Sequence, residues 1–200
     1  MRLFQLIFGI ALMIQPALGQ HCLSPNKQIN VAFAVNKKGV PTYQIQYKQK
    51  SVILESSMGF ELVEDDDLME NFKLLDVIYD TKDEVWNPVW GEEREIRNHY
   101  NEMLVTLQQK KTSRRMNIRF RVFNEGVGFR YEFPQQADFG HFIIQQERTS
   151  FTLTGDHTTH WIPGDYDTQE YDYTTSRISK IESLFDVALT GNASQEQFSK

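Results

Sequence analysis

The sequence predicts an all-β fold of the sandwich or barrel class. Three observations predict it: short runs that alternate apolar and polar residues with period two, glycine-containing turns between these runs, and little helical periodicity. Aromatic residues form 12% of the chain and charged residues 24%, which is typical of a folded domain. Eight or nine such strands are expected, which is the number found in a sandwich or a barrel.

Two pairs of alternating runs predict β-hairpins. In the first pair, residues 29–35 and 43–47 flank a glycine-containing turn, and in the second pair residues 116–122 and 127–133 do so. One face of the second pair is charged and carries Arg119, Arg121, Arg130 and Glu132. Because the opposite face is apolar, this hairpin is expected to lie in an antiparallel sheet with one buried face.

Weaker signals complete the predicted sheets. Short strands are expected at 52–54, 60–63, 102–108, 142–146 and 150–154. Three consecutive aspartates open the segment 65–75, which predicts a charged loop followed by a short helical or irregular stretch. The apolar residues of 178–189 have helical spacing and predict an amphipathic helix that covers a sheet.

The amino terminus predicts an export signal. Arg2 precedes a nearly unbroken apolar run over 3–14, and small residues lie three positions and one position before Gln20. The apolar run is shorter than the ~20 residues that a membrane span requires. We therefore expect removal of 1–19 and export of 20–200 to the periplasm, without membrane attachment.

Charge and cysteine content exclude several classes of protein. The 21 basic and 27 acidic residues give a formal charge of −6, whereas a nucleic-acid binder driven by phosphate contacts needs a basic face. A single cysteine, Cys22, excludes a disulfide scaffold and a cysteine-rich zinc site. The sequence also lacks the Gly-x-Ser-x-Gly, Walker and Gly-x-Gly-x-x-Gly motifs of serine hydrolases and nucleotide-binding proteins.

Two segments concentrate residues suited to binding. Residues 86–102 contain two tryptophans, a histidine and interleaved carboxylates and guanidiniums, which suit either a sugar platform or a salt-bridged loop and strand edge packed on something larger. Residues 161–173 carry four carboxylates among three tyrosines, which suit a hard-cation site, a carbohydrate site or an exposed acidic turn. The second segment is not an EF-hand loop, because Glu170 stands where that loop needs glycine.

These segments also carry a family resemblance. The strings at 86–102, 129–136 and 161–173 resemble the amino-terminal domain of glycoside hydrolase family 97, most closely its periplasmic α-glucosidases of bacterial starch utilisation, and the match runs from about Ser24 to the end. The resemblance implies a galactose-mutarotase-like antiparallel β-super-sandwich that precedes a catalytic (β/α)8 barrel. It also implies inverting hydrolysis of α-glucosidic bonds in starch-derived oligosaccharides, with the participation of Ca²⁺.

The resemblance assigns roles to single residues. Glu170 is the implied calcium ligand, and Gly191, Asn192 and Ala193 are implied to lie near the sugar subsite. The implied acid and base are glutamates of the barrel, which needs about 250 residues, so no catalytic residue is expected in 20–200. The sandwich is expected to be incomplete at its carboxy-terminal end.

The expected partners are an α-gluco-oligosaccharide and the barrel of the complete enzyme, and nucleic acid is not among them. Two alternatives stay open. One is a stand-alone carbohydrate-binding β-sandwich without catalytic activity, and the other is an interaction domain whose acidic motifs are only surface.

Overall fold

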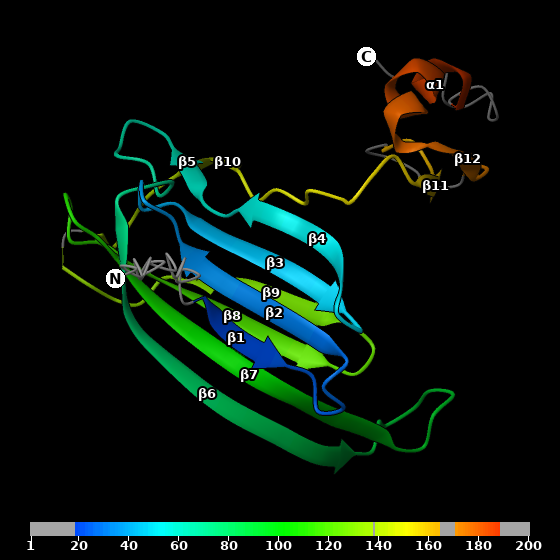
Figure 1. The fold of residues 1–200 in the computed structure, drawn as a ribbon, viewed down its shortest axis with the longest axis horizontal. Helices are drawn as coiled ribbons and strands as arrows, with labels where there is room; N and C mark the ends of the chain where they lie inside the picture. The colour runs from blue at the N-terminus through cyan, green and yellow to red at the C-terminus, as the bar shows by residue number, and fades with distance from the viewer. Residues whose placement is uncertain (1–18, 138, 165–170, 189–200) are drawn as a thin grey trace, which may run out of the picture. The chain divides into compact units, whose positions relative to one another are not determined.

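The computed structural model describes residues 19–137, 139–164 and 171–188. The chain divides into two compact units, Met1–Thr152 and Leu153–Lys200. In its described residues the first unit consists of antiparallel strands, and the second contains a β-hairpin and a short helix (Figure 1). The all-β prediction is therefore confirmed.

One four-stranded sheet of the first unit pairs its strands in chain order. It comprises β1 (Gln20–Leu23), β2 (Ile29–Val35), β3 (Pro41–Tyr47) and β4 (Lys50–Ser57). The β2–β3 pair is the first predicted hairpin, with Phe33 opposite Tyr43. Strand β1 was not predicted, and it begins at the residue that follows the expected cleavage site of the export signal.

A second four-stranded sheet also runs in chain order, and it comprises β6 (Phe72–Trp86), β7 (Ile96–Gln109), β8 (Arg115–Phe123) and β9 (Val127–Glu132). The β8–β9 pair is the second predicted hairpin, with Phe120 opposite Phe129. Alternate residues of β8 are fully buried, as the period-two pattern predicts, namely Met116, Ile118, Phe120 and Val122.

The core lies between the two four-stranded sheets. The Phe120 ring of β8 lies 6.0 Å from the Phe33 ring of β2 and 6.4 Å from the Tyr43 ring of β3, measured between ring centroids. These three side chains are at most 1% exposed. Aromatic contacts across the two layers therefore hold the sandwich together.

Strand β6 corrects the prediction for 65–75. The charged loop and the irregular stretch are present over 65–71, but 72–75 are the beginning of a 15-residue strand, which pairs with β7 from Phe72 opposite Gln109 to Trp86 opposite Ile96. The charged residues of β6 conceal its pattern, because an edge strand keeps both faces of most of its length in water. Pairing with the strongly patterned β7 makes this segment a strand.

The predicted strand at 150–154 is also wrong. Within the first unit, the small sheet pairs β5 (Phe60–Leu62) with β10 (Ile144–Glu147), and the chain then runs along β4 without a regular ladder. Two backbone bonds remain there, from the amide of Ser150 to Ser57 and from the amide of Leu54 to Thr152. Serine hydroxyls take the other two: the amide of Ser57 donates to Oγ of Ser150 at 2.8 Å, and the amide of Thr152 donates to Oγ of Ser56 at 2.9 Å. These bonds interrupt the strand.

The second unit contains β11 (Thr158–Trp161), β12 (Thr174–Arg177), a 3-10 turn at Ile178–Lys180 and the helix α1 (Ile181–Ala188). Helical structure is thus confirmed within 178–188, and no described residue of α1 is buried. Among the residues that the structure describes, no helix has both the length and the apolar character to cross a membrane.

Candidate functional site

The four site residues implied by the family resemblance lie outside the described residues. Glu170 falls in the gap at 165–170, and Gly191, Asn192 and Ala193 fall beyond residue 188. Their roles stay predictions. In the described ranges, no group of three or more histidine, cysteine, aspartate or glutamate side chains is arranged to hold a metal ion.

The acidic segment 161–173 is the connection within a β-hairpin. Its first residue, Trp161, lies opposite Thr174 in the β11–β12 ladder, so the two ends of the segment are held together. The Trp161 indole donates a hydrogen bond to Oγ of Ser176 at 3.0 Å. The indole nitrogen of Trp161 therefore links β11 to β12.

The segment 86–102 forms the end of the long β6–β7 hairpin. Arg97 makes a bidentate contact with Asp83 across the two strands, with both N–O distances 2.8 Å. One arginine of this segment is therefore paired with a residue of the neighbouring strand, while the choice between a sugar platform and a packed, salt-bridged edge stays open. Near the turn, Trp86 is 50% exposed and Trp90 is 88% exposed, so neither ring belongs to the core.

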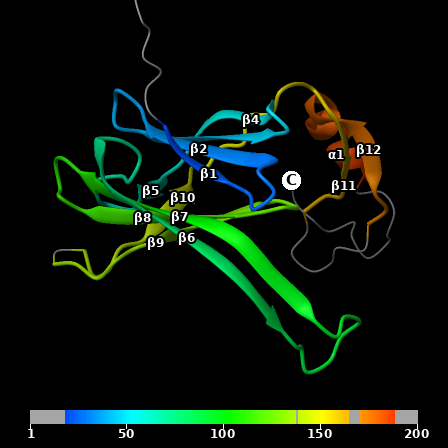
Figure 2. The same ribbon diagram turned by 60° about the horizontal axis from the view of Figure 1, so that its bottom comes forward.

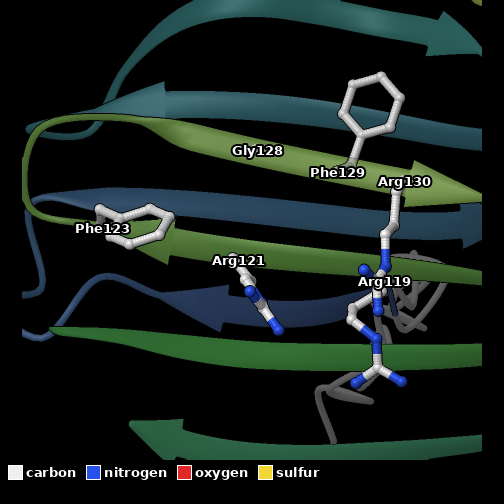
Figure 3. A pocket seen from close by; sticks show the side chains of 6 residues that line it. All are labelled: Arg119, Arg121, Phe123, Gly128, Phe129 and Arg130. Carbon is white, nitrogen blue, oxygen red and sulfur yellow. The ribbon is translucent and has the colours of Figure 1, made fainter. Parts of the chain in front are cut away.

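A network of five charged side chains lies on the outer face of the second sheet. Arg119 of β8 joins two carboxylates: it contacts Glu102 of β7 and binds Glu132 of β9, with 2.6 Å between Nε and Oε1. Arg121 donates to the other oxygen of Glu102 at 2.8 Å, and Arg130 donates to Glu132 at 2.8 Å. Figure 3 shows Arg119 and Arg121 extending from β8 toward β7, the strand that carries Glu102.

The network is partly withdrawn from water. Glu102 is only 8% exposed, although it points away from the core. Hydrogen bonding to Arg119 holds the pKa of Glu132 below its usual range, and the bond to Glu132 raises the pKa of Arg119. Both carboxylates are engaged by arginines, which favours a structural role for this face.

A shallow depression of about 190 Å³ lies beside this network, and it is lined by Arg119, Arg121, Phe123, Gly128, Phe129 and Arg130 (Figure 3). A Cβ atom at Gly128 would meet no heavy atom within 4 Å, so the absence of a side chain leaves the space open.

The sequence pattern predicts that the arginines share one face, but it does not predict that Glu102 joins them. The β7–β8 register, in which Glu102 lies opposite Arg121, supplies it.

Cys22 is a free thiol that is 3% exposed. Burial, followed by the nearby charge of Glu102, raises the pKa of the Cys22 thiol to about 11. At pH 8 such a thiol is about one part in a thousand thiolate, which is the reactive form.

We expect Ellman's reagent to label Cys22 of the native protein at least 100-fold more slowly than Cys22 of the protein in guanidinium chloride, with Cys22→Ser as the blank. Equal rates would contradict this burial.

The comparisons with known proteins agree with this geometry. The described strands define a two-layer antiparallel β-sandwich. The family model described as glycosyl-hydrolase 97 N-terminal matches residues 22–197. The chain therefore belongs to the family of glycoside hydrolase 97 amino-terminal domains.

Solved structures show the same relationship. A glycoside hydrolase family 97 enzyme from Pseudoalteromonas sp. strain K8, solved in complex with panose and in complex with acarbose, superposes with a TM-score of 0.74 at 32% identity. The match covers 78% of this chain and 24% of that chain. A crystal structure of a β-arabinopyranosidase shares the fold, with a TM-score of 0.67 at 21% identity over 78% of this chain and 26% of that one.

Among curated proteins, a retaining α-galactosidase of Bacteroides thetaiotaomicron is 28% identical over 152 residues, which are 70% of this chain and 22% of that protein. The chain thus spans about a quarter of the length of the relatives that it matches.

Proposed function

We propose that this chain is the amino-terminal domain of an exported, calcium-dependent α-glucosidase that acts on starch-derived oligosaccharides with inversion. The single observation that carries the substrate class is the 32% identity to the Pseudoalteromonas enzyme, whose complexes hold panose and acarbose. Panose is an α-linked trisaccharide of glucose, and the curated α-galactosidase is less similar at 28%. The family membership itself does not depend on this choice.

The domain's proposed role is to support the catalytic barrel and to supply one ligand to its calcium ion. Calcium takes six to eight oxygen ligands, and Glu170 offers at most two of them. The remaining ligands, together with the catalytic acid and base, are proposed to come from the rest of the enzyme. Gly191, Asn192 and Ala193 are proposed to lie near the sugar, and the signal at 1–19 is proposed to direct the enzyme to the periplasm.

The test uses the longest polypeptide encoded by the reading frame that contains residues 1–200. We expect it to release glucose from maltose and from 4-nitrophenyl α-glucoside, with the β-anomer of glucose appearing first by NMR.

Glu170→Gln should lower turnover at least tenfold and weaken the response to calcium, because a neutral amide is a poorer calcium ligand than a carboxylate. Asp172→Asn, an exposed acid of the same segment, is the matched control and should keep the calcium response.

Three outcomes would contradict parts of the proposal. Faster hydrolysis of an α-galactoside than of the α-glucoside would replace the substrate class. A calcium response that Glu170→Gln leaves unchanged would remove the ligand. Glucose release by the 200-residue chain alone would show that the acid and base lie within it.

The exposed Trp86 and Trp90 favour a second candidate, a stand-alone carbohydrate-binding domain, because tryptophan rings stack on sugar faces. Titrating maltotetraose into the 200-residue chain tests it. Heat of binding that Trp90→Ala abolishes would support this candidate, and the absence of heat would reject it.

A further inference from the structure

The β6–β7 hairpin continues beyond the sheet to which it belongs. Strand β7 pairs with β8 from Tyr100 to Gln108, so among the described residues its segment 96–99 has a ladder partner only in β6. Figure 2 shows this hairpin extending away from the two layers of the sandwich. A two-stranded ribbon is marginally stable by itself, so the part of this hairpin that lies beyond the sheet needs a further source of stability.

The charged side chains of this ribbon are paired within it. Arg97 holds Asp83 through two hydrogen bonds, and Glu84 contacts both Asn98 and Lys82, at 2.9 and 3.1 Å. These contacts run across the strands and along β6. They join the two strands along this part of the ribbon, so its charged groups are satisfied before its end is reached.

That end is apolar. Four large hydrophobic side chains are exposed within six residues: Val85 at 56%, Trp86 at 50%, Val89 at 99% and Trp90 at 88%. Soluble domains rarely leave such a group in water unless it meets a partner. Tryptophan is also the residue type most enriched among those that dominate binding energy at protein interfaces.

A charged border follows the apolar end. Glu92, Glu93, Arg94 and Glu95 are all exposed, and their charges sum to −2. An apolar centre with a polar border is the usual composition of a protein–protein interface. The complementary surface is therefore an apolar pocket flanked by lysine or arginine side chains.

We propose that the end of the β6–β7 hairpin, residues 85–95, docks into such a pocket on the catalytic domain of the same polypeptide. This inference rests on the proposed function, because that domain is part of it. The match covers only 24% of the Pseudoalteromonas enzyme. In that enzyme, most of the polypeptide that the hairpin of an amino-terminal domain could contact therefore lies outside the matched domain. Val89 favours a protein over a sugar, since an aliphatic side chain offers a sugar neither a ring face nor a hydrogen bond.

The experiment compares the complete polypeptide with the 200-residue chain. In the complete polypeptide, Trp90→Ala and Val89→Asp should each raise the rate of proteolytic cleavage between the two domains about tenfold, because loss of an anchoring side chain raises the undocked population. In the 200-residue chain, the same changes should leave the melting temperature unaltered. Tyr47→Ala, a 43% exposed aromatic on β3, is the control and should alter neither.

Several results would overturn the docking proposal. One is a cleavage rate of the complete polypeptide that Trp90→Ala and Val89→Asp leave unchanged. Another is a lower melting temperature of the 200-residue chain with either change, which would show that the hairpin end packs within this chain. Maltotetraose binding that depends on Trp90 would assign the surface to sugar, and a dimer that Val89→Asp dissociates would assign it to a second copy. None of these readouts measures turnover, so a failed substrate assignment is distinguishable from failed docking.

Discussion

Replacing Phe120 with alanine is expected to lower the free energy of unfolding by about 4 kcal/mol. Phe120 is fully buried, and its ring lies 6.0 Å from Phe33, 6.4 Å from Tyr43 and 5.9 Å from Phe129, measured between centroids. Truncation removes contacts with both sheets and leaves a cavity that the strands cannot fill. Urea unfolding followed by circular dichroism measures the change.

The control for this substitution is Phe123→Ala. Phe123 lies on the same strand but on its outer face, where its ring contacts Tyr100 at 5.1 Å. Its truncation should cost less than half as much, because part of the ring already meets water. If Phe120→Ala leaves too little folded protein to measure, Phe120→Leu is used instead, and it should lower the free energy of unfolding by less than the ~4 kcal/mol expected for alanine. Equal losses at 120 and 123 would contradict the two-layer core.

Replacing Arg119 with methionine is expected to lower the free energy of unfolding by about 3 kcal/mol. The change removes the guanidinium that joins Glu102 and Glu132, and it leaves the nearly buried Glu102 with Arg121 alone. The apolar stem of methionine keeps most of the packing, so the loss reports the charge contacts. Arg97→Met is the control, because the Arg97–Asp83 pair is exposed and its loss should lie within experimental error.

The same substitution should change the response to acid. Because the folded-state pKa of Glu132 lies below its ordinary value of 4.5, this residue stabilises the fold above pH 4.5, and the contribution disappears as pH falls through the folded-state pKa. The first cause of that lowered pKa is Arg119. The Arg119→Met protein should therefore lose less stability between pH 5 and pH 3 than the wild-type protein. An identical slope would contradict the role of Arg119.

The fold was predictable where burial alternates along the strand. Strand β8 reads as a strand because every second residue faces the core, and β2 does so for the same reason. Strand β6 was not predictable, because an exposed edge strand carries no such alternation and depends on β7 for its conformation. The segment 150–154 failed for a different reason: the side chains of Ser150 and of Ser56 on β4 accept amide hydrogen bonds that a regular ladder would direct to backbone carbonyls.

The candidate site divides in the same way. The arginines of β8 and β9 could be assigned to one face by counting residues, and the structure confirms that face. Glu102 belongs to their network only because the register of β7 and β8 places it opposite Arg121, and no local pattern encodes that register. The residue type of the two tryptophans in 86–102 marks this segment as a binding candidate, whereas their exposure at the end of the β6–β7 hairpin is a property of the folded chain.

The sequence by itself determined the all-β class, the two central hairpins, the charged and apolar faces of β8 and β9, and the strings that carry the family resemblance. These features are local: period-two alternation, turn residues and continuous motifs depend on neighbours along the chain. Only the tertiary structure decided which carboxylate the arginines bind, that the charged 72–86 segment is a strand, and that the Trp86–Trp90 end stands clear of the core. Strand register and edge position follow from packing between distant segments, so they become visible only when the chain is folded.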